Sequence, residues 1–195
     1  MANKSAKSNR AGEKKELTAS GYFKKKVYTI KVSMPPIGTR VYNNLECVWY
    51  TVSEKERFVL TGTRGEQWCI KPEKLAKTYK FATGQPINEV TINEYFIKQG
   101  RKSMNVTTMP DNTLYYAEQV RYPQQFQVST SWGAVLNGNL PEDPNTGKKI
   151  PHGNGDYKVC MADPMTGACD TSDCWIVNGA VMLDTYKVAS PANKK

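Results

Sequence analysis

The chain lacks any long hydrophobic run. No apolar stretch in its 195 residues approaches the roughly 18 residues that a membrane-spanning helix needs. The N-terminal segment also lacks the apolar stretch of a secretory signal. We therefore expect a soluble protein that has no membrane partner and stays inside the cell that makes it.

Metal-binding motifs are also absent. His152 is the only histidine, and none of the five cysteines forms a C-x-x-C pair, so the sequence predicts neither a disulfide framework nor a zinc ribbon. One alternative is a zinc site made of His152, Cys160, Cys169 and Cys174, whose side chains suit tetrahedral coordination. Because their spacing matches no compact zinc motif, we interpret the cysteines as free thiols and expect no metal.

Catalytic motifs are absent as well. His152 lies in a loop rich in proline and glycine, with no nucleophile elbow nearby. Asp163, Asp170 and Asp173 lack the spacing of a calcium loop, and no glycine-rich phosphate loop occurs. The sequence therefore predicts a protein that is not an enzyme, with no catalytic residues and no cofactor.

An internal repeat is the clearest feature that is present. Trp68 and Tyr79 lie 11 residues apart, and so do Trp175 and Tyr186. Upstream of each tryptophan, Phe-Val-Leu-Thr at 58–61 corresponds to Tyr-Lys-Val-Cys at 157–160, with eight more residues before the second tryptophan. Self-similarity of this kind predicts one small unit that is used twice.

Turn and strand signals outline this unit. The β-rich runs 57–61 and 66–70 flank Gly62 and Gly65, which predicts a hairpin. Pro72 can open a short helix, and Thr-Tyr-Lys then begins an exit strand in each copy. The predicted fold class is α+β, mainly antiparallel β, with two diverged copies of a hairpin, short helix and strand unit packed together.

The same signals divide the chain. We predict a disordered basic tail at 1–21, copy one at 22–81, a connecting segment at 82–110, copy two at 111–188 and a C-terminal tail at 189–195. The connecting segment has the spacing of a capping box between Thr91 and Glu94, which predicts a short helix at 92–99. Residues 137–155 and 161–173 are rich in turn residues, and we expect them to form solvent-facing loops.

Charge is distributed unevenly. The net charge is +9, and residues 1–26 contribute eight basic against two acidic groups. Residues 27–81 hold nine basic and five acidic groups, whereas residues 111–188 hold five basic and nine acidic ones. A dipolar body of this kind can orient on a charged partner or form a homo-oligomer by head-to-tail association.

Two sets of residues are therefore candidates. The candidate macromolecule-binding residues are the basic side chains of the tail and of the first predicted helix, for which a solvated surface without a ligand is the alternative: Lys4, Lys7, Arg10, Lys14, Lys15, Lys24, Lys25, Lys26, Lys71, Lys74, Lys77 and Lys80. The predicted repeat core consists of the aromatic residues that recur in register: Phe58, Trp68, Tyr79, Tyr157, Trp175 and Tyr186.

Part of the repeat resembles a known group of proteins. Residues 57–79, with Gly65-Glu66 in a hairpin, Lys71-Pro72 and Thr78-Tyr79, resemble the C-terminal half of small phage and prophage proteins. Gly155-Asp156-Tyr157 is similar to the PGDYG motif for which one such family of uncharacterised function is named, and residues 22–27 resemble the basic start of that family. Copy one departs from the motif, because Glu56-Arg57 stands where Gly-Asp would be.

The resemblance covers about residues 22–81 and, more loosely, 114–188. It implies a bacteriophage origin and a small β-rich fold, and it carries no catalytic or binding residues. From it we expect a non-enzymatic phage protein in the host cytoplasm that binds a host or phage protein, with inhibition of a host defence as one outcome. Two alternatives are a minor virion or decoration protein with a basic arm, and a sponge that holds an anionic signalling nucleotide near Trp68, Trp175 and residues 71–80.

Nucleic acid is a further partner through the N-terminal tail, and its binding has a measurable signature. If roughly four to six of the basic groups in residues 1–26 contact phosphates, the log-log slope of affinity against salt is about −4 to −5 on duplex DNA. Filter binding of full-length and truncated protein at two salt concentrations checks this. Equal affinity of both proteins would leave the tail as a solvated extension.

Overall fold

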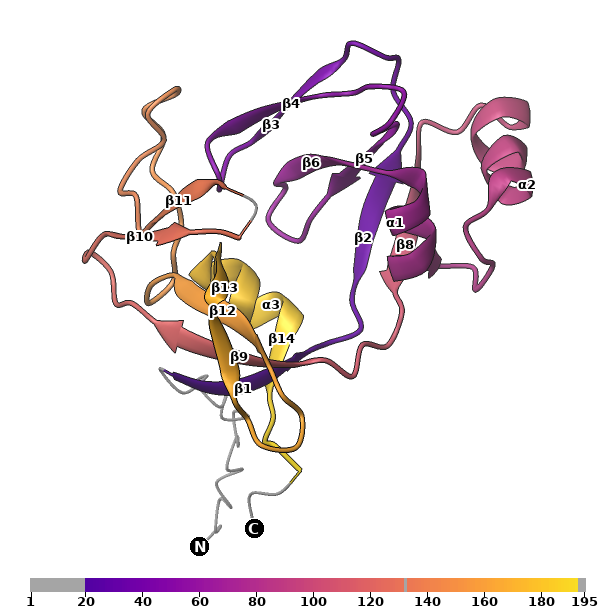
Figure 1. Ribbon diagram of the computed structural model, residues 1–195. Coiled ribbons are helices and arrows are strands. Elements are labelled where there is room, and N and C mark those ends of the chain that lie inside the picture. The colour runs from indigo at the N-terminus through magenta and orange to yellow at the C-terminus, as the bar shows by residue number, and fades with distance from the viewer. Residues whose placement is uncertain (1–19, 132, 193–195) are drawn as a thin grey trace, which may run out of the picture.

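The computed structural model describes residues 20–131 and 133–192. Within these residues the fold is α+β and mainly antiparallel β, which confirms the predicted fold class. Two five-stranded sheets form its main body, with two two-stranded hairpins and short helices around them (Figure 1).

The five strand positions of one sheet correspond one to one with those of the other, in the orders given below. The first is ordered β6-β5-β2-β8-β7, from β2 (Thr29–Ser33), β5 (Phe58–Thr61), β6 (Gln67–Ile70), β7 (Tyr79–Phe81) and β8 (Ser103–Thr108). The second is ordered β13-β12-β9-β1-β14, from β1 (Ser20–Lys25), β9 (Leu114–Gln119), β12 (Tyr157–Ala162), β13 (Cys169–Val177) and β14 (Tyr186–Val188). We call each sheet, with the helix that follows its hairpin, the first and the second unit.

The residue register also corresponds between the units. In the first sheet Leu60 lies opposite Trp68, and in the second Val159 lies opposite Trp175. Ile30 and Val32 alternate with exposed neighbours along β2, as a strand with one face on a core does. The two tryptophans therefore occupy equivalent positions, as their repeated spacing indicates.

The first unit is continuous in sequence and is inserted into the second. All strands of the first sheet lie in residues 29–108, including β8, which pairs with β2 and β7, whereas β1 precedes the first unit and pairs with β9 and β14 in the second sheet. Phe23 of β1 and Val106 of β8, both 0% exposed, occupy equivalent core positions. These pairings correct the predicted boundaries, in which residues 22–26 belong to copy one and 103–108 to the connecting segment.

The place of β1 in the second sheet alters the boundary of the N-terminal tail. β1 begins at Ser20, two residues before the expected start of the folded body at residue 22. Removing residues 1–26 would therefore also remove the strand between β9 and β14 in the second sheet. A truncation that isolates the tail must leave Ser20 in place.

Two helices follow the hairpins at equivalent positions. α1 (Pro72–Thr78) buries Leu75, and α3 (Gly179–Thr185) buries Met182. Asn178 caps α3 by accepting a hydrogen bond from the N–H of Ala180 at 3.0 Å, whereas α1 has no side-chain cap and begins with proline. Among the described residues, no helix is long and apolar enough to cross a membrane.

The connecting helix begins earlier than predicted. α2 (Glu89–Ile92) continues into a π-helical turn, η1 (Asn93–Lys98), and its capping box joins Asn88 to Thr91 rather than Thr91 to Glu94. The prediction failed because two overlapping polar spacings were available, and the upstream asparagine caps the helix. Phe96 of η1 packs against Phe58, with ring centroids 6.1 Å apart, so this helix covers the first core.

A side-chain contact joins the two units. At the tip of the β5–β6 hairpin, Arg64 donates two hydrogen bonds to the carboxylate of Asp184 in α3, at 2.7 and 3.0 Å. Within the second unit, Lys26, directly after β1, donates through Nζ to the carbonyl of Leu183 at 2.7 Å. The remaining strands form two hairpins, β3 (Arg40–Asn43) with β4 (Val48–Thr51) and β10 (Phe126–Ser129) with β11 (Val135–Gly138).

Because the first unit is inserted between β1 and β9, which pair in the second sheet, we expect the units to unfold together. Phe23→Ala removes a fully buried side chain of β1 and should cost about 3–5 kcal/mol. Hydrogen exchange in denaturant should show the midpoints of both sheets falling by the same amount. Val27→Ala, at a side chain that is 57% exposed, is the control with little effect. A lower midpoint in the second sheet alone would contradict the coupling.

Candidate binding groove

A buried carboxylate organises the start of α3 in the second unit. Asp156 accepts hydrogen bonds from the N–H of Gly179 at 2.9 Å and from the N–H of Asn139 at 2.8 Å. Its Oδ1 also lies 2.8 Å from Nδ1 of His152, and all of these side chains are buried. Asp156, from the Gly-Asp-Tyr sequence, thereby joins the loop at residues 139–156 to the helix.

His152 is held from both sides of its ring. Its Nε2 lies 2.6 Å from the carbonyl oxygen of Leu140, so both ring nitrogens face acceptors, and the ring stacks on Tyr122. Burial lowers the pKa of His152, but the hydrogen bonds to Asp156 and Leu140 outweigh it and raise the pKa above its ordinary value. The contact with Asp156 is therefore a buried ion pair whenever the imidazole of His152 is protonated.

This arrangement corrects the expectation of a solvent-facing loop at 137–155. Asn139, Asp143 and His152 are buried, and Asn178 donates through Nδ2 to the carbonyl of Pro151 at 2.9 Å. The turn-rich composition indicated a loop correctly, but it gave no sign that one polar network holds the loop on the protein.

The end of that loop covers one face of α3. The carbonyl oxygens of His152 and Gly155 lie so close to the Cα of Gly179 that a side chain there would clash with both. Gly153 lies against Ala180 and Leu183. Residues 152–155 thus form a lid, the α3 lid, over Gly179, Ala180 and Leu183.

The first unit has no such lid. Its corresponding loop spans only residues 52–57, against residues 139–156 in the second unit. In the aligned register, Arg57 replaces Asp156, Lys71 replaces Asn178 and Pro72 replaces Gly179. The carboxylate, the helix cap and the N–H that bind the lid in the second unit are therefore all missing from the first.

An apolar groove lies at the uncovered position. It has a volume of about 420 Å³ and runs between α1, the start of β5 and the segment that leads into α2. Pro72, Glu73 and Ala76 in its wall correspond to the three residues beneath the α3 lid. Its other lining residues are Met34, Arg57, Phe58, Ile87, Asn88, Glu89 and Ile92.

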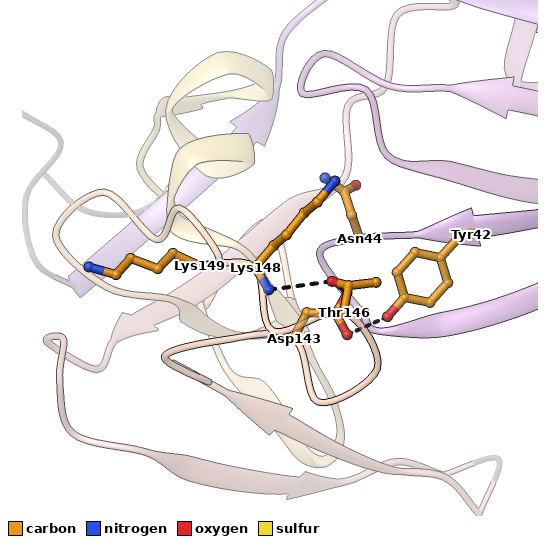
Figure 2. Close-up of a pocket in the computed structure, with 6 residues that line it drawn as sticks. All are labelled: Tyr42, Asn44, Asp143, Thr146, Lys148 and Lys149. Atoms are coloured by element: carbon orange, nitrogen blue, oxygen red, sulfur yellow. Dashed lines mark hydrogen bonds between the residues drawn. The ribbon is translucent and has the colours of Figure 1, made fainter.

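A smaller polar cavity of about 160 Å³ lies where the β3–β4 hairpin meets the loop of the second unit (Figure 2). Tyr42 donates to Asp143 at 2.5 Å, and Asn145 donates to the hydroxyl of Tyr42 at 3.0 Å. Burial and the contact with Asp143 raise the pKa of Tyr42 to about 12. Lys148 and Lys149, which also line the cavity, are exposed. This cavity is a polar junction between the units.

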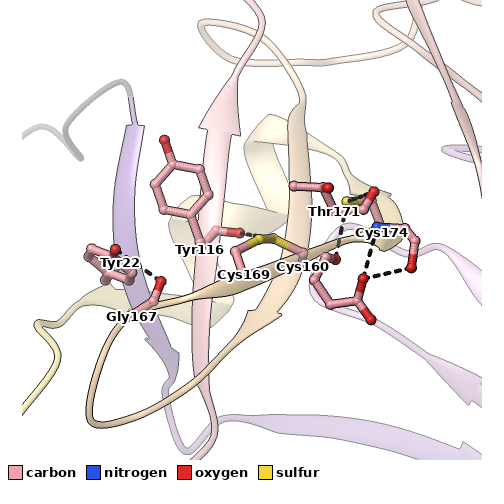
Figure 3. The surroundings of a disulfide bond; sticks show 9 residues. Tyr22, Tyr116, Cys160, Gly167, Cys169, Thr171 and Cys174 are labelled. Carbon is pink, nitrogen blue, oxygen red and sulfur yellow. Dashed lines mark hydrogen bonds between the residues drawn. A yellow bond between two sulfur atoms is a disulfide. The ribbon is translucent and has the colours of Figure 1, made fainter.

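The cysteines differ from their predicted state. Cys160 and Cys169 form a disulfide between β12 and β13 (Figure 3). The interpretation as free thiols is wrong for this pair and holds for Cys47, Cys69 and Cys174. Spacing along the chain could not reveal the pairing, because the bulge between Cys160 and Ala162 in the β12–β13 register decides which side chains meet.

The zinc alternative is not supported by these positions. A disulfide occupies two of its four ligands, and His152 is bound by Asp156 and Leu140. In residues 20–131 and 133–192, no group of three or more histidine, cysteine or acidic side chains could hold a metal ion.

The candidate basic residues fall into three sets. Lys4, Lys7, Arg10, Lys14 and Lys15 lie outside the described residues. Lys24, Lys25 and Lys26 belong to β1 or follow it; burial lowers the pKa of Lys25, whose Nζ lies 5.3 Å from the centre of the Tyr115 ring. Lys71, Lys74, Lys77 and Lys80 are exposed along α1 and β7.

The aromatic residues serve two separate cores. Phe58, Tyr79, Tyr157 and Tyr186 are buried, and Trp68 and Trp175 are partly buried. Trp68 packs in the core of the first sheet and Trp175 in that of the second, so the structure does not bring the two tryptophans together. The groove was not predicted from the sequence. The signal that could have indicated it is the replacement of Gly-Asp by Glu56-Arg57, because this change removes the aspartate that holds the lid in the second unit.

No protein-family model, curated protein or solved structure matches the chain.

The contact between His152 and Asp156 predicts a pH-dependent stability. Because the pKa of His152 is raised in the folded protein, its contribution is fully present below the ordinary value of about 6.5 and is lost as the pH rises through the folded value. The difference in unfolding free energy between wild type and His152→Gln should therefore shrink from about pH 6 to about pH 9.

A second variant tests the same pair from the other side. Asp156→Asn should cost about 3–5 kcal/mol at about pH 6, because it leaves the buried imidazolium without a counter-charge. Urea denaturation across the pH range checks both variants. A difference between wild type and His152→Gln that is constant with pH would show that His152 is neutral in the folded protein.

Proposed function

We propose that this protein is a non-enzymatic binding protein that docks a partner protein in the apolar groove of the first unit. The observation that supports this is the difference between the units: one helix face is covered by the chain itself, and the equivalent face is open. In the second unit, the start of α3 is covered by a short stretch of polypeptide, residues 152–155.

The properties of the groove agree with this role. Six of its ten lining residues are apolar, and Arg57, Glu73 and Glu89 add charge among them. Such a combination supplies binding energy from apolar burial and orientation from a few polar groups.

The biological setting comes from the sequence resemblance alone. The resemblance to small phage and prophage proteins favours a partner of host or phage origin in the cytoplasm of an infected bacterium. Interference with a host defence is one consequence that docking of a host protein would have. A non-enzymatic role is consistent with the structural use of His152, which both its hydrogen bonds devote to holding the loop.

Two matched arginine substitutions test the proposal. Ala76→Arg places a long charged side chain inside the groove, whereas Val90→Arg adds the same charge at an exposed neighbour that does not line it. Proteins captured from the infected host by wild type should be retained by Val90→Arg and lost, by about tenfold or more, with Ala76→Arg. Quantitative mass spectrometry measures the recovery.

Thermal melts of both variants serve as the folding control. Arg57→Glu provides a second groove variant, because it reverses a charge without adding bulk to the helix surface. Partners that bind all variants equally would overturn the groove as the docking site.

A further inference from the structure

Three cysteines lie together in the β12–β13 hairpin of the second unit (Figure 3). Cys160 is bonded to Cys169, with their Cα atoms 6.2 Å apart, and Cys174 lies directly opposite Cys160 in the strand register. Cys160 and Cys174 are buried in one apolar cluster with Val128, and Cys169 packs against it. The free thiol of Cys174 therefore lies across the hairpin from one sulfur of an existing disulfide.

The strand register gives Cys160 a second partner. Residues directly opposite each other in an antiparallel pair project to the same face and have Cα atoms about 4.5–5.5 Å apart. Disulfides form at Cα distances of about 4.4–6.8 Å. The pairing of Cys160 with Cys174 falls in this range, as does the 6.2 Å between Cys160 and Cys169. Two alternative disulfides of Cys160 are therefore compatible with one backbone.

We infer that Cys160, Cys169 and Cys174 form a thiol–disulfide exchange site. The thiolate of Cys174 attacks the Sγ of Cys160, so that a bond between these two sulfurs forms. The bond between Cys160 and Cys169 breaks, and Cys169 leaves as a thiolate, which takes up from solvent the proton that Cys174 lost. One thiol and one disulfide are present before and after the step, so the exchange needs no oxidant or reductant.

The bulge in β13 sets when the exchange can occur. Residues 170–173 separate the two partners of Cys160 and are exposed or partly exposed. The thiol of Cys174 donates to the carbonyl of Thr171, within this bulge, at 3.3 Å. Burial raises the pKa of Cys174, so the thiol stays protonated while the bulge is closed. Opening of the bulge admits solvent to Cys174, and its thiolate then attacks.

The exchange changes which part of the hairpin is crosslinked. The bond to Cys169 closes the tip at residues 161–168. Within this tip, Gly167 accepts a hydrogen bond from the hydroxyl of Tyr22 at 3.1 Å, and Pro164 accepts one from the N–H of Ala192 at 2.9 Å. A bond from Cys160 to Cys174 would enclose the bulge as well and leave Cys169 as a partly buried thiol. The contacts of the tip with β1 and with the C-terminal segment would then no longer be supported by the crosslink at its base.

Trapping of the released thiol tests the exchange in the wild-type full chain. The oxidised protein is incubated with N-ethylmaleimide and no reductant, at a pH of about 8, near the ordinary pKa of a cysteine. It is then denatured with excess reagent and cleaved before its aspartates, which places the three cysteines on separate peptides, 156–162, 163–169 and 173–183. We expect label on Cys169 to accumulate with time, together with a bond between peptides 156–162 and 173–183. A sample denatured at time zero gives the starting pattern.

Two serine variants provide the controls. Cys174→Ser should keep the bond between Cys160 and Cys169 and take up no label at Cys169. Cys169→Ser, oxidised in air, should form the bond between Cys160 and Cys174 and leave Cys47 and Cys69 as its free thiols. Circular dichroism and thermal melts check the folding of both variants.

Three results would overturn the exchange site. The first is wild type that carries label on Cys174 and keeps the bond between Cys160 and Cys169. The second is equal labelling of Cys169 in wild type and in Cys174→Ser, which would assign the exchange to another thiol. The third is folded, oxidised Cys169→Ser in which Cys160 and Cys174 are both free, because the two side chains would then not meet.

Discussion

The insertion of the first unit between β1 and β9 is the constraint on which the rest of the structure depends. All strands of the first sheet lie in residues 29–108, whereas the second sheet pairs β1 with β9 and β14, which lie in residues 114–188. Phe23 of β1 has 0% exposure in the second core, so the strand that precedes the first unit completes the sheet that follows it. The two connections lie together, since the N–H of Thr108 donates to the carbonyl of Tyr28 at 3.0 Å. Units of this size have little core of their own, and the insertion ties them into one body.

Because the backbone framework is shared, the two units can differ in the surfaces that surround it. The second unit has a long loop whose polar network, centred on Asp156 and His152, covers the start of α3. In the first unit, three substitutions in the equivalent positions remove the carboxylate, the cap and the N–H, and the loop is short. These three changes go together, because burying the Asp156 carboxylate without its N–H donors would cost free energy. The same framework therefore carries one closed and one open helix face.

The sequence allowed the local parts of this fold to be predicted. The spacing from Trp68 to Tyr79 and from Trp175 to Tyr186 gave the hairpin, helix and exit strand in the correct register, because these elements are close in sequence. The pairing of β1 could not be predicted this way, because β1 and β9 are separated in sequence by the whole first unit. The buried state of His152 was hidden for a similar reason, since its partners come from a helix and a loop that meet only in three dimensions.

Because the protein contains two copies of one unit, the groove of the first can be compared with the equivalent face of the second. An open apolar groove alone does not say what fills it, because its shape is compatible with many ligands. Here the protein contains its own comparison, in which the equivalent face is covered by polypeptide, and residue 57 differs in charge at the position where that polypeptide is anchored. A carboxylate that accepts N–H groups requires a lid rich in donors, whereas a guanidinium requires a lid with acceptors. The substitution of arginine for aspartate therefore removes the carboxylate that anchors such a lid, and it does so without altering the fold that presents the groove.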